Sequence, residues 1–128
     1  SGPMDLSERI ARLKASKRVK LVKVKGWLMA FSIVSAYQAS AARALISLGA
    51  HVAVVGGQKA DKIQVSMRAA RDFFENTGVH LGRDVAKPLG EFLNGMGGGH
   101  SVSAGVNGIG DVEAGLKHCF RLLKGRLT

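Results

Sequence analysis

The sequence is poor in cysteine, in aromatic residues and in acidic residues, and it contains no long apolar segment. Cys119 is its only cysteine, so no internal disulfide can form, and we expect a protein of a reducing, cytoplasmic compartment. The longest apolar run, Trp27 to Val34, is interrupted by Ser32 and is much shorter than the roughly 20 residues that cross a bilayer. We therefore expect no membrane partner. Aromatic residues make up only 5% of the chain, which argues against a surface on which many nucleic-acid bases stack.

Basic residues, in contrast, are abundant. The 19 lysines and arginines outnumber the 9 acids and give a net charge of +10, which favours polyanionic partners and nucleic acid first. Eight of these basic residues lie between Arg9 and Lys25, where no acid occurs. That stretch is either a nucleic-acid surface or a solvated helix and edge strand whose lysines oppose aggregation, and composition leaves both interpretations open.

The length of 128 residues and the 46% content of hydrophobic residues predict one folded domain with an ordinary apolar core. Residues 1–3, which precede Met4, resemble the cleavage scar of an expression tag, so we expect the chain to be a piece of a longer protein. Residues 4–18 are predicted to form a basic N-terminal helix, and residues 19–128 the domain that follows it.

The pattern of apolar residues predicts the order of helices and strands. Helical spacing, such as that of Leu6, Ile10 and Leu13, predicts helices at about 6–16, 35–49, 84–93 and from 111 onward. The third of them is expected to be capped by Asp84 and to turn Leu89, Phe92 and Leu93 inward. Short alternating or continuous apolar runs predict strands at about 22–25, 27–34, 51–55, 63–68 and 101–107. This order implies an α/β domain, with a mixed β-sheet of about five strands covered by helices.

One predicted strand carries polar side chains that qualify as a site. Gln64, Ser66 and Arg68 alternate with apolar residues, so a strand places these three side chains together on the face opposite the core. Arg68 can bind a phosphate with two parallel hydrogen bonds and stays charged at neutral pH. The competing interpretation is a surface salt bridge between Arg68 and Asp72.

A second candidate is the glycine-rich segment that ends on His100. Gly95 and Gly97 to Gly99 cost backbone entropy, so we expect a loop whose successive N–H groups form a nest for phosphate or carboxylate oxygens. The segment is not a Walker A motif, because no Lys-Ser or Lys-Thr follows, and His100 stands where the dinucleotide fingerprint needs its third glycine. The competing interpretations are a mobile linker and a histidine hydrogen-bonded to backbone.

Taken together, these segments resemble a known family. Gly97-Gly98-Gly99-His100-Ser101-Val102-Ser103-Ala104-Gly105 resembles the GGGHxxAAG motif of the DHH-associated domain, the C-terminal module of DHH-family phosphoesterases, and differs at one constant position, Ser103. Val65-Ser66-Met67-Arg68-Ala69 resembles the upstream Ser-x-Arg-Ser segment of that family, with Ala69 in place of the last serine. The resemblance extends over about residues 22–128.

The resemblance implies a substrate-binding domain. Arg68 and His100 would contact the phosphate or the terminal nucleotide beside Ser66, Gly97, Gly98 and Gly99 would let the backbone approach it, and Ala104 and Gly105 would keep the next strand close. The implied partners are single-stranded DNA or RNA, short oligonucleotides or a cyclic dinucleotide, as in RecJ-type exonucleases and nanoRNases. A DHH domain in the same parent chain would carry the manganese ions and activate water.

No catalytic group is expected in this chain itself. Its acids are scattered and no Asp-His-His run occurs, so we predict no metal ligands and no hydrolysis by this fragment alone. Ser66 lacks an evident general base, and Cys119 lies on a predicted apolar stripe, which indicates a core thiol.

Two other functions stay open. The first is a non-catalytic nucleic-acid-binding or replication-scaffold module that uses the basic N-terminal surface. A related module of alanyl-tRNA synthetase also has a glycine-rich motif, but it typically carries arginine where His100 stands, so tRNA binding ranks lower.

Overall fold

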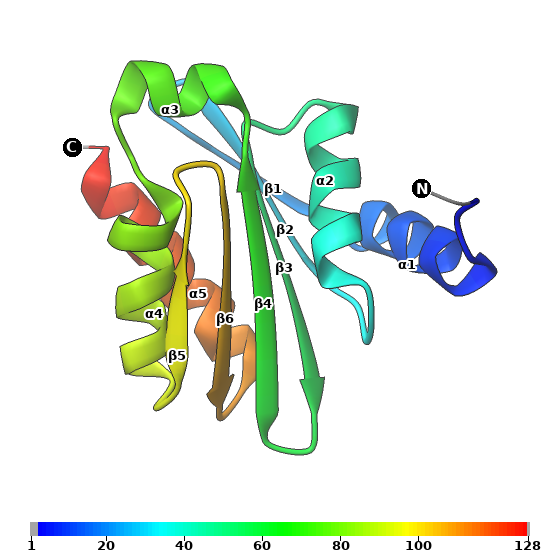
Figure 1. Ribbon diagram of the computed structural model, residues 1–128. Helices are drawn as coiled ribbons and strands as arrows, with labels where there is room; N and C mark the ends of the chain where they lie inside the picture. Colours follow the sequence, from blue (N-terminus) through cyan, green and yellow to red (C-terminus); the bar gives the residue numbers. More distant parts are fainter. Residues whose placement is uncertain (1–2, 128) are drawn as a thin grey trace.

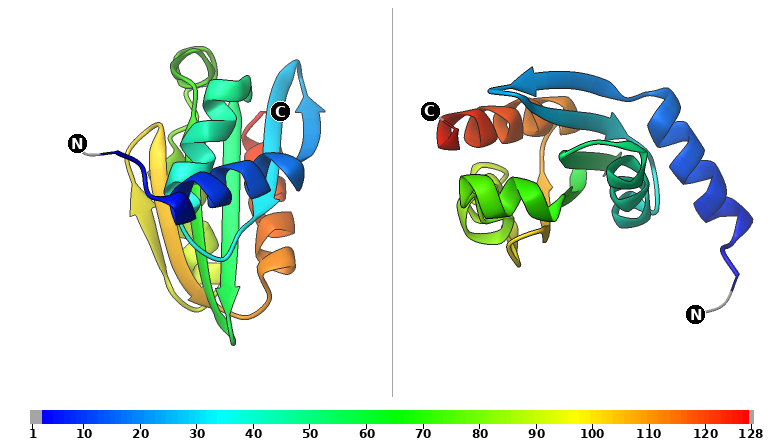
Figure 2. Two further views of the ribbon diagram at one scale, coloured as in Figure 1. Left: turned by 90° about the vertical axis from the view of Figure 1, so that its right-hand side faces the viewer. Right: turned by 90° about the horizontal axis from the view of Figure 1, so that it is seen from above.

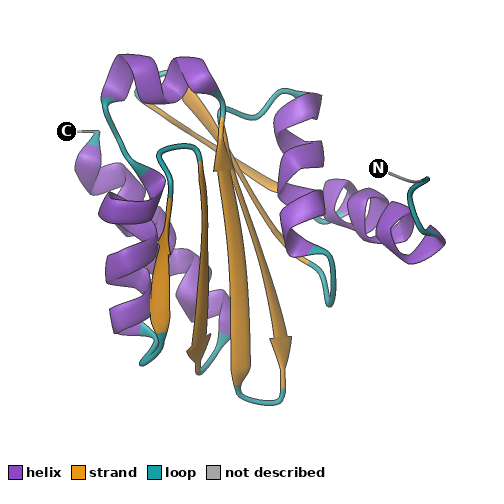
Figure 3. Ribbon diagram, viewed as in Figure 1, coloured by secondary structure: helices purple, strands orange, loops and turns teal. Residues whose placement is uncertain are grey.

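The computed structural model describes residues 3–127, so Ser1 and Gly2 of the expected cleavage scar lie outside the described residues. The strands of the described part are β1 (Lys20–Val24), β2 (Trp27–Ile33), β3 (Val52–Lys59), β4 (Lys62–Ala69), β5 (Met96–Gly99) and β6 (Ser103–Ile109). Its helices are α1 (Leu6–Lys17), α2 (Gln38–Leu48), α3 (Arg71–Thr77), the π-helix η1 (Leu81–Ala86), α4 (Lys87–Phe92) and α5 (Val112–Arg126). Figure 3 shows this alternation of strands and helices, which confirms the predicted α/β domain.

The strands of residues 3–127 form one six-stranded mixed sheet in the order β1-β2-β3-β4-β6-β5 (Figure 1). Strands β2 and β3 are parallel and are joined through α2, whereas the other neighbouring strands are antiparallel. The sheet has one strand more than expected, because the glycine segment predicted as a loop pairs with β6 as the edge strand β5.

Helices cover the two faces of the sheet unequally (Figures 1 and 2). The larger core joins one face to α3, η1, α4 and α5 through large side chains such as Phe73, Leu89 and Leu123. On the opposite face α1 and α2 pack through small residues, among them Ala15 and Ala41. Helix α2 crosses β3 and β4, and no helix of the described chain lies over β6 and β5 on that face.

Helix α1 occupies the predicted range but buries a different face. Its packing residues are Ala11 and Ala15, whereas Leu6 and Leu13 are 72% and 70% exposed. Alanine allows α1 to approach α2 closely, and the hydroxyl of Ser32 donates to the carbonyl oxygen of Ala15 at 2.8 Å. The regular spacing of the large apolar residues therefore predicts the helix correctly but not its buried side.

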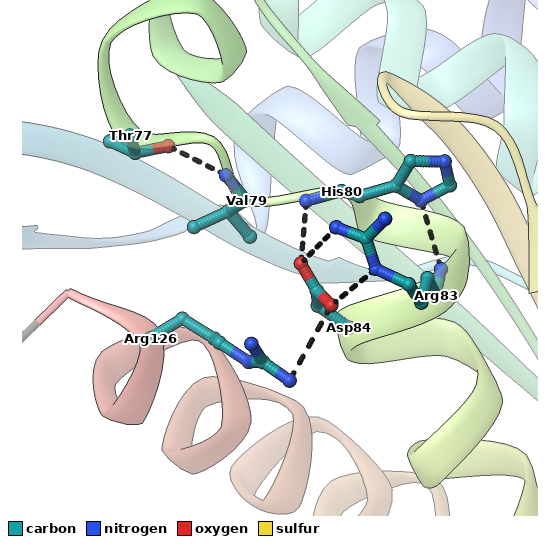
Figure 4. A network of polar contacts seen from close by, with 6 residues as sticks. All are labelled: Thr77, Val79, His80, Arg83, Asp84 and Arg126. Atoms are coloured by element: carbon teal, nitrogen blue, oxygen red, sulfur yellow. Dashed lines mark hydrogen bonds and ion pairs between the residues drawn. The ribbon is translucent and has the colours of Figure 1, made fainter.

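The prediction that Asp84 caps a helix is wrong, because the helical segment begins at Leu81 and Asp84 lies buried inside it. His80 is the N-cap, and its Nδ1 accepts from the N–H of Arg83 at 3.0 Å. The carboxylate of Asp84 accepts from the N–H of His80 at 2.9 Å and lies 3.4 Å from Nη2 of Arg126 on α5 (Figure 4). The reciprocal bonds resemble a capping box and connect η1 to α5.

Three smaller differences also have packing causes. The short helix α3 was not predicted, and the fully buried Phe73 anchors it. Strand β3 continues to Lys59, past its expected end at residue 55, since its glycines stay in the ladder with β4. Phe92, expected to face inward, is 51% exposed and stacks on His118 at 3.7 Å between ring centroids.

None of the helices in residues 3–127 is long and apolar enough to cross a membrane.

Candidate functional site

The uncovered half of the α2 face is the candidate site, and we call it the open face. Residues that pair directly across antiparallel strands share a face of the sheet. Gln64, Ser66 and Arg68 of β4 pair in turn with Asn107, Gly105 and Ser103 of β6, and Gly98 of β5 pairs with Gly105. The open face is thus a polar surface formed by β4, β6 and β5, and the predicted alternation of β4 is confirmed.

The glycines of β5 fall into two groups according to the side they present. A β-carbon at Gly97 would collide with the carbonyl oxygen of Ala86, and one at Gly99 would meet the backbone of Ser103 and Ala104. At Gly98, in contrast, a β-carbon would have no heavy atom within 4 Å. Packing against η1 and β6 therefore explains Gly97 and Gly99, whereas the fold places no steric limit on a side chain at Gly98.

The expected nest of N–H groups is wrong in its geometry. In an extended strand successive N–H groups point to opposite sides, so the N–H groups of β5 do not converge on one anion. Helices η1 and α4 pack directly against the backbone of β5, because a β-carbon at Gly82 would collide with the backbone of Gly99 and one at Gly90 with the backbone of Gly97. Because Gly98 has no side chain, a ligand can approach the backbone of β5 closely from the open face.

Arg68 is half-buried on the open face and has no acidic partner among residues 3–127. Its Nη1 donates to the carbonyl oxygen of Met67 at 2.9 Å. Asp72, the expected partner in the salt-bridge interpretation, lies 3.9 Å from Nε2 of His51 instead. Burial, and then the positive charge of Arg43 on α2, lower the pKa of Arg68 from its ordinary value. Two cations thus border the open face, and no carboxylate of the described residues pairs with either of them.

His100 follows β5 at the same end of the sheet as Arg68. Its backbone N–H donates to the carbonyl oxygen of Ser103 at 2.8 Å, and its own carbonyl oxygen accepts from the N–H of Gly82 at 3.0 Å. Because Ser103 also pairs with Arg68, the backbone brings these two site residues to one place. The imidazole is exposed and makes no hydrogen bond to the described residues, so its backbone is held while its ring is available.

The remaining predicted site residues divide between the two faces. Ser66 shares the open face but is only 8% exposed. Gly105 lies on the open face opposite Gly98, whereas the side chain of Ala104 belongs to the larger core. Gly97 packs on η1, so its part in the site is to hold β5 in position.

Sequence reasoning missed Ser103, Asn107 and Arg43. Ser103 and Asn107 alternate with Ala104 and Val106, and that pattern would have identified them. No local signal identifies Arg43, because its proximity to Arg68 depends on how α2 crosses the sheet.

Other reactive groups lie away from the open face. Cys119 is fully buried on α5, as predicted for a core thiol, and burial raises its pKa to about 12. Among the described side chains, no group of three or more His, Cys, Asp or Glu residues is placed to hold a metal ion.

Comparison with known proteins places this arrangement among solved folds. The C-Ala domain of alanyl-tRNA synthetase from Aquifex aeolicus superposes with a TM-score of 0.62 at 19% identity, over 84% of this chain and 97% of that domain. An exopolyphosphatase-related protein from Bacteroides fragilis matches with a TM-score of 0.63 at 17% identity, over 97% of this chain and 36% of that one. A DHH-domain member of the s1p family of ribosomal proteins matches with a TM-score of 0.61 at 17% identity, over 92% and 30% of the two chains.

The molecule is thus an α/β domain with an open polar sheet face and a glycine edge strand. Its fold is that of the DHH-associated domain, as the GGGH segment predicted. No protein-family model matches the sequence. Among curated proteins, an uncharacterized protein of Methanocaldococcus jannaschii is 41% identical over 105 residues, which cover 80% of this chain and 31% of that protein. The chain therefore spans about a third of the length of this curated relative.

Proposed function

We propose that the domain is the substrate-binding module of a DHH-family phosphodiesterase that acts on single-stranded nucleic acid or short oligonucleotides. The open face captures a phosphate through Arg68 and His100, while the backbone of β5 at Gly98 lies against it. A DHH domain elsewhere in the parent protein supplies the manganese ions and the hydrolysis, so this fragment alone is inactive.

The state of Arg68 is the observation that supports this proposal. A half-buried guanidinium beside a second cation is unfavourable unless an anion compensates it, and no carboxylate of the described chain does so. Four of the five N–H donors of Arg68 remain for a ligand once the bond to Met67 is counted. A phosphate diester has the charge and the oxygen spacing that such a planar group binds with two parallel bonds.

Each residue then has a positioning role. Arg68 fixes the phosphate, and the imidazole of His100 donates a further hydrogen bond to it or to the terminal nucleotide. Gly98 and Gly105 present no side chains, so the strand backbone itself forms the floor of the site. Holding the phosphate in one place allows a neighbouring catalytic domain to act on a substrate that is already oriented.

The test is fluorescence-anisotropy binding of a short labelled single strand, as DNA and as RNA, in a salt series. We expect Arg68→Ala and His100→Ala each to weaken binding by about 1–3 kcal/mol, the value of charge-assisted hydrogen bonds. Arg68→Lys should recover only part of the loss, because an ammonium cannot form the paired bonds.

Lys87→Ala is the matched control for lost charge, since Lys87 is exposed on α4, on the covered side of the sheet. It should change binding little. Binding that is equal in wild type, Arg68→Ala and His100→Ala would refute the phosphate site.

A second candidate is binding of nucleic acid by the basic N-terminal surface, here Arg9 to Lys25. Seven of its eight basic side chains are exposed, and Arg12 is the exception. Under this alternative Lys14→Glu with Lys17→Glu abolishes binding, while Arg68→Ala has no effect. A tRNA arm of the same assay tests the third candidate, since the C-Ala domain of alanyl-tRNA synthetase shares this fold.

A further inference from the structure

A cavity lies on the opposite face of the sheet, far from the open face in strand order. It has a volume of about 610 Å³ and lies between the hairpin β1–β2 and helix α5. Lys20 of β1 pairs with Phe31 of β2, and both line the cavity. We call it the basic-rimmed groove. Three strands, β2, β3 and β4, separate its outer wall at β1 from β6 and β5.

The floor of the groove is apolar. It consists of Val22, Phe31, Ile33, Leu116 and Phe120. The rings of Phe31 and Phe120 meet edge to face with their centroids 6.0 Å apart. Val22, Ile33 and Phe120 remain partly exposed, so the gap between the hairpin and α5 leaves apolar surface in water. A contiguous apolar hollow of this kind is typical of a binding site.

The rim carries an excess of positive charge. Arg18, Lys20, Lys117 and Arg121 border the groove, and Glu113 is its one acid. Within residues 3–127 none of these four cations forms an ion pair with an acid. The guanidinium of Arg18 donates to the carbonyl oxygen of Ile33 at 3.1 Å, which holds that cation at the edge of the floor.

We propose that the basic-rimmed groove docks an acidic amphipathic segment of a partner protein. Apolar side chains on one side of such a segment cover the floor, and carboxylates on either side reach the four cations. This is the helix-in-groove mode of recognition, with charge complementarity to fix its register. The phosphate site proposed above uses no residue of this groove.

Single-stranded nucleic acid fits the groove less well. Bases bind proteins by stacking on exposed aromatic faces. Phe31 is only 8% exposed, and both rings already form an edge-to-face pair, so no flat aromatic platform is presented. A phosphate backbone would contact the rim and leave the apolar floor uncovered.

The probe that tests this is a labelled synthetic helical peptide with leucines at positions i, i+3, i+4 and i+7 and glutamates elsewhere. Two control peptides have the same length: in one the leucines are scrambled around the helix, and in the other lysine replaces glutamate. We expect anisotropy to show binding of the first peptide only, with both controls weaker by about tenfold or more.

Variants locate the binding. Lys117→Glu combined with Arg121→Glu should weaken binding of the acidic peptide by about tenfold or more. Lys59→Glu with Lys62→Glu is the matched charge reversal, at the exposed β3–β4 hairpin outside the groove, and should change binding little. Phe120→Ala tests the floor, and circular dichroism checks that each variant is folded.

Chemical-shift changes on peptide addition supply a readout that needs no variant, and they should cluster at Val22, Ile33 and Phe120. Three outcomes would overturn the proposal: no peptide binding, equal binding of all three peptides, or shifts that lie elsewhere. A fourth outcome would also overturn it: a single-stranded oligonucleotide displaces the peptide and no longer binds the Lys117→Glu, Arg121→Glu variant. That result would show that the groove binds nucleic acid.

Discussion

Two alanine substitutions at neighbouring residues of β5 should separate folding from ligand approach. In Gly97→Ala the new methyl group collides with the carbonyl oxygen of Ala86 and comes within 2.9 Å of Val106. Backbone cannot rotate away as a side chain can, and overpacking of this kind costs about 1–3 kcal/mol. Alanine also lowers the conformational entropy of the unfolded chain, which offsets about 0.4–1 kcal/mol of this loss of stability. We therefore expect a net loss of about 1–2 kcal/mol, or a melting temperature lower by about 4–10 °C.

Gly98→Ala should behave in the opposite way. Its methyl group has no heavy atom within 4 Å, and its backbone lies outside the left-handed region, so stability should stay constant or rise by up to about 1 kcal/mol. The same methyl group, however, projects from the open face beside Gly105. It should hold a phosphate away from the strand and weaken oligonucleotide binding by about tenfold, the value of one good hydrogen bond.

Urea denaturation followed by circular dichroism, together with oligonucleotide anisotropy in the same buffer, measures both effects. Gly125→Ala on α5 is the control, since its β-carbon meets no heavy atom within 4 Å and it should leave binding unchanged. A Gly97→Ala protein as stable as wild type would refute the packing explanation of the glycine strand. Wild-type binding by Gly98→Ala would refute the approach of ligand along the open face.

Three further substitutions test packing and electrostatics. Asp84→Asn should lower stability at neutral pH by about 1–2 kcal/mol, because the buried carboxylate accepts charge-assisted bonds. The bond from Arg83 foremost lowers the pKa of Asp84 below 3.8, so its stabilisation is present above that pH and is lost as pH falls through the folded-state value. Denaturation in a pH series should therefore show wild type and Asp84→Asn converging in acid; a constant gap would contradict this. Ala15→Leu should lower stability by about 1–3 kcal/mol through overpacking against α2. Leu13→Ala should change stability by less than about 0.5 kcal/mol, because Leu13 is exposed. Equal shifts in melting temperature for the two variants would contradict the burial of the alanine face of α1.

Several features of the fold follow from local pattern because one side of an element is buried. The alternation at Gln64, Ser66 and Arg68 predicts both strand β4 and the face on which its polar groups lie. Helix α5 begins next to Asp111 as expected, and the carboxylate of Asp111 accepts from the N–H of Ala114 at 2.9 Å. These signals depend only on neighbours in sequence.

The rest depends on partners distant in sequence. Glycine has no side chain, so the segment at Gly97 shows no alternation of apolar and polar residues and is predicted as a loop. Pairing with β6 nevertheless makes it a strand. The buried side of α1 is set by the close approach of α2, which favours alanine over the more regular leucines. Arg43 joins the site only because α2 crosses β4.

The reactivity of the single thiol, Cys119, reports on transient opening of the core around α5. Cys119 is fully buried, and a pKa of about 12 leaves almost no thiolate in the folded protein at neutral pH. Alkylation therefore requires transient opening of the core, and its rate measures how often α5 leaves the sheet. A ligand that loses its binding site when α5 leaves the sheet slows that rate by the factor 1 + [L]/Kd. The basic-rimmed groove is lined by α5, so the dissociation constant of the peptide can be read from one unlabelled, wild-type chain.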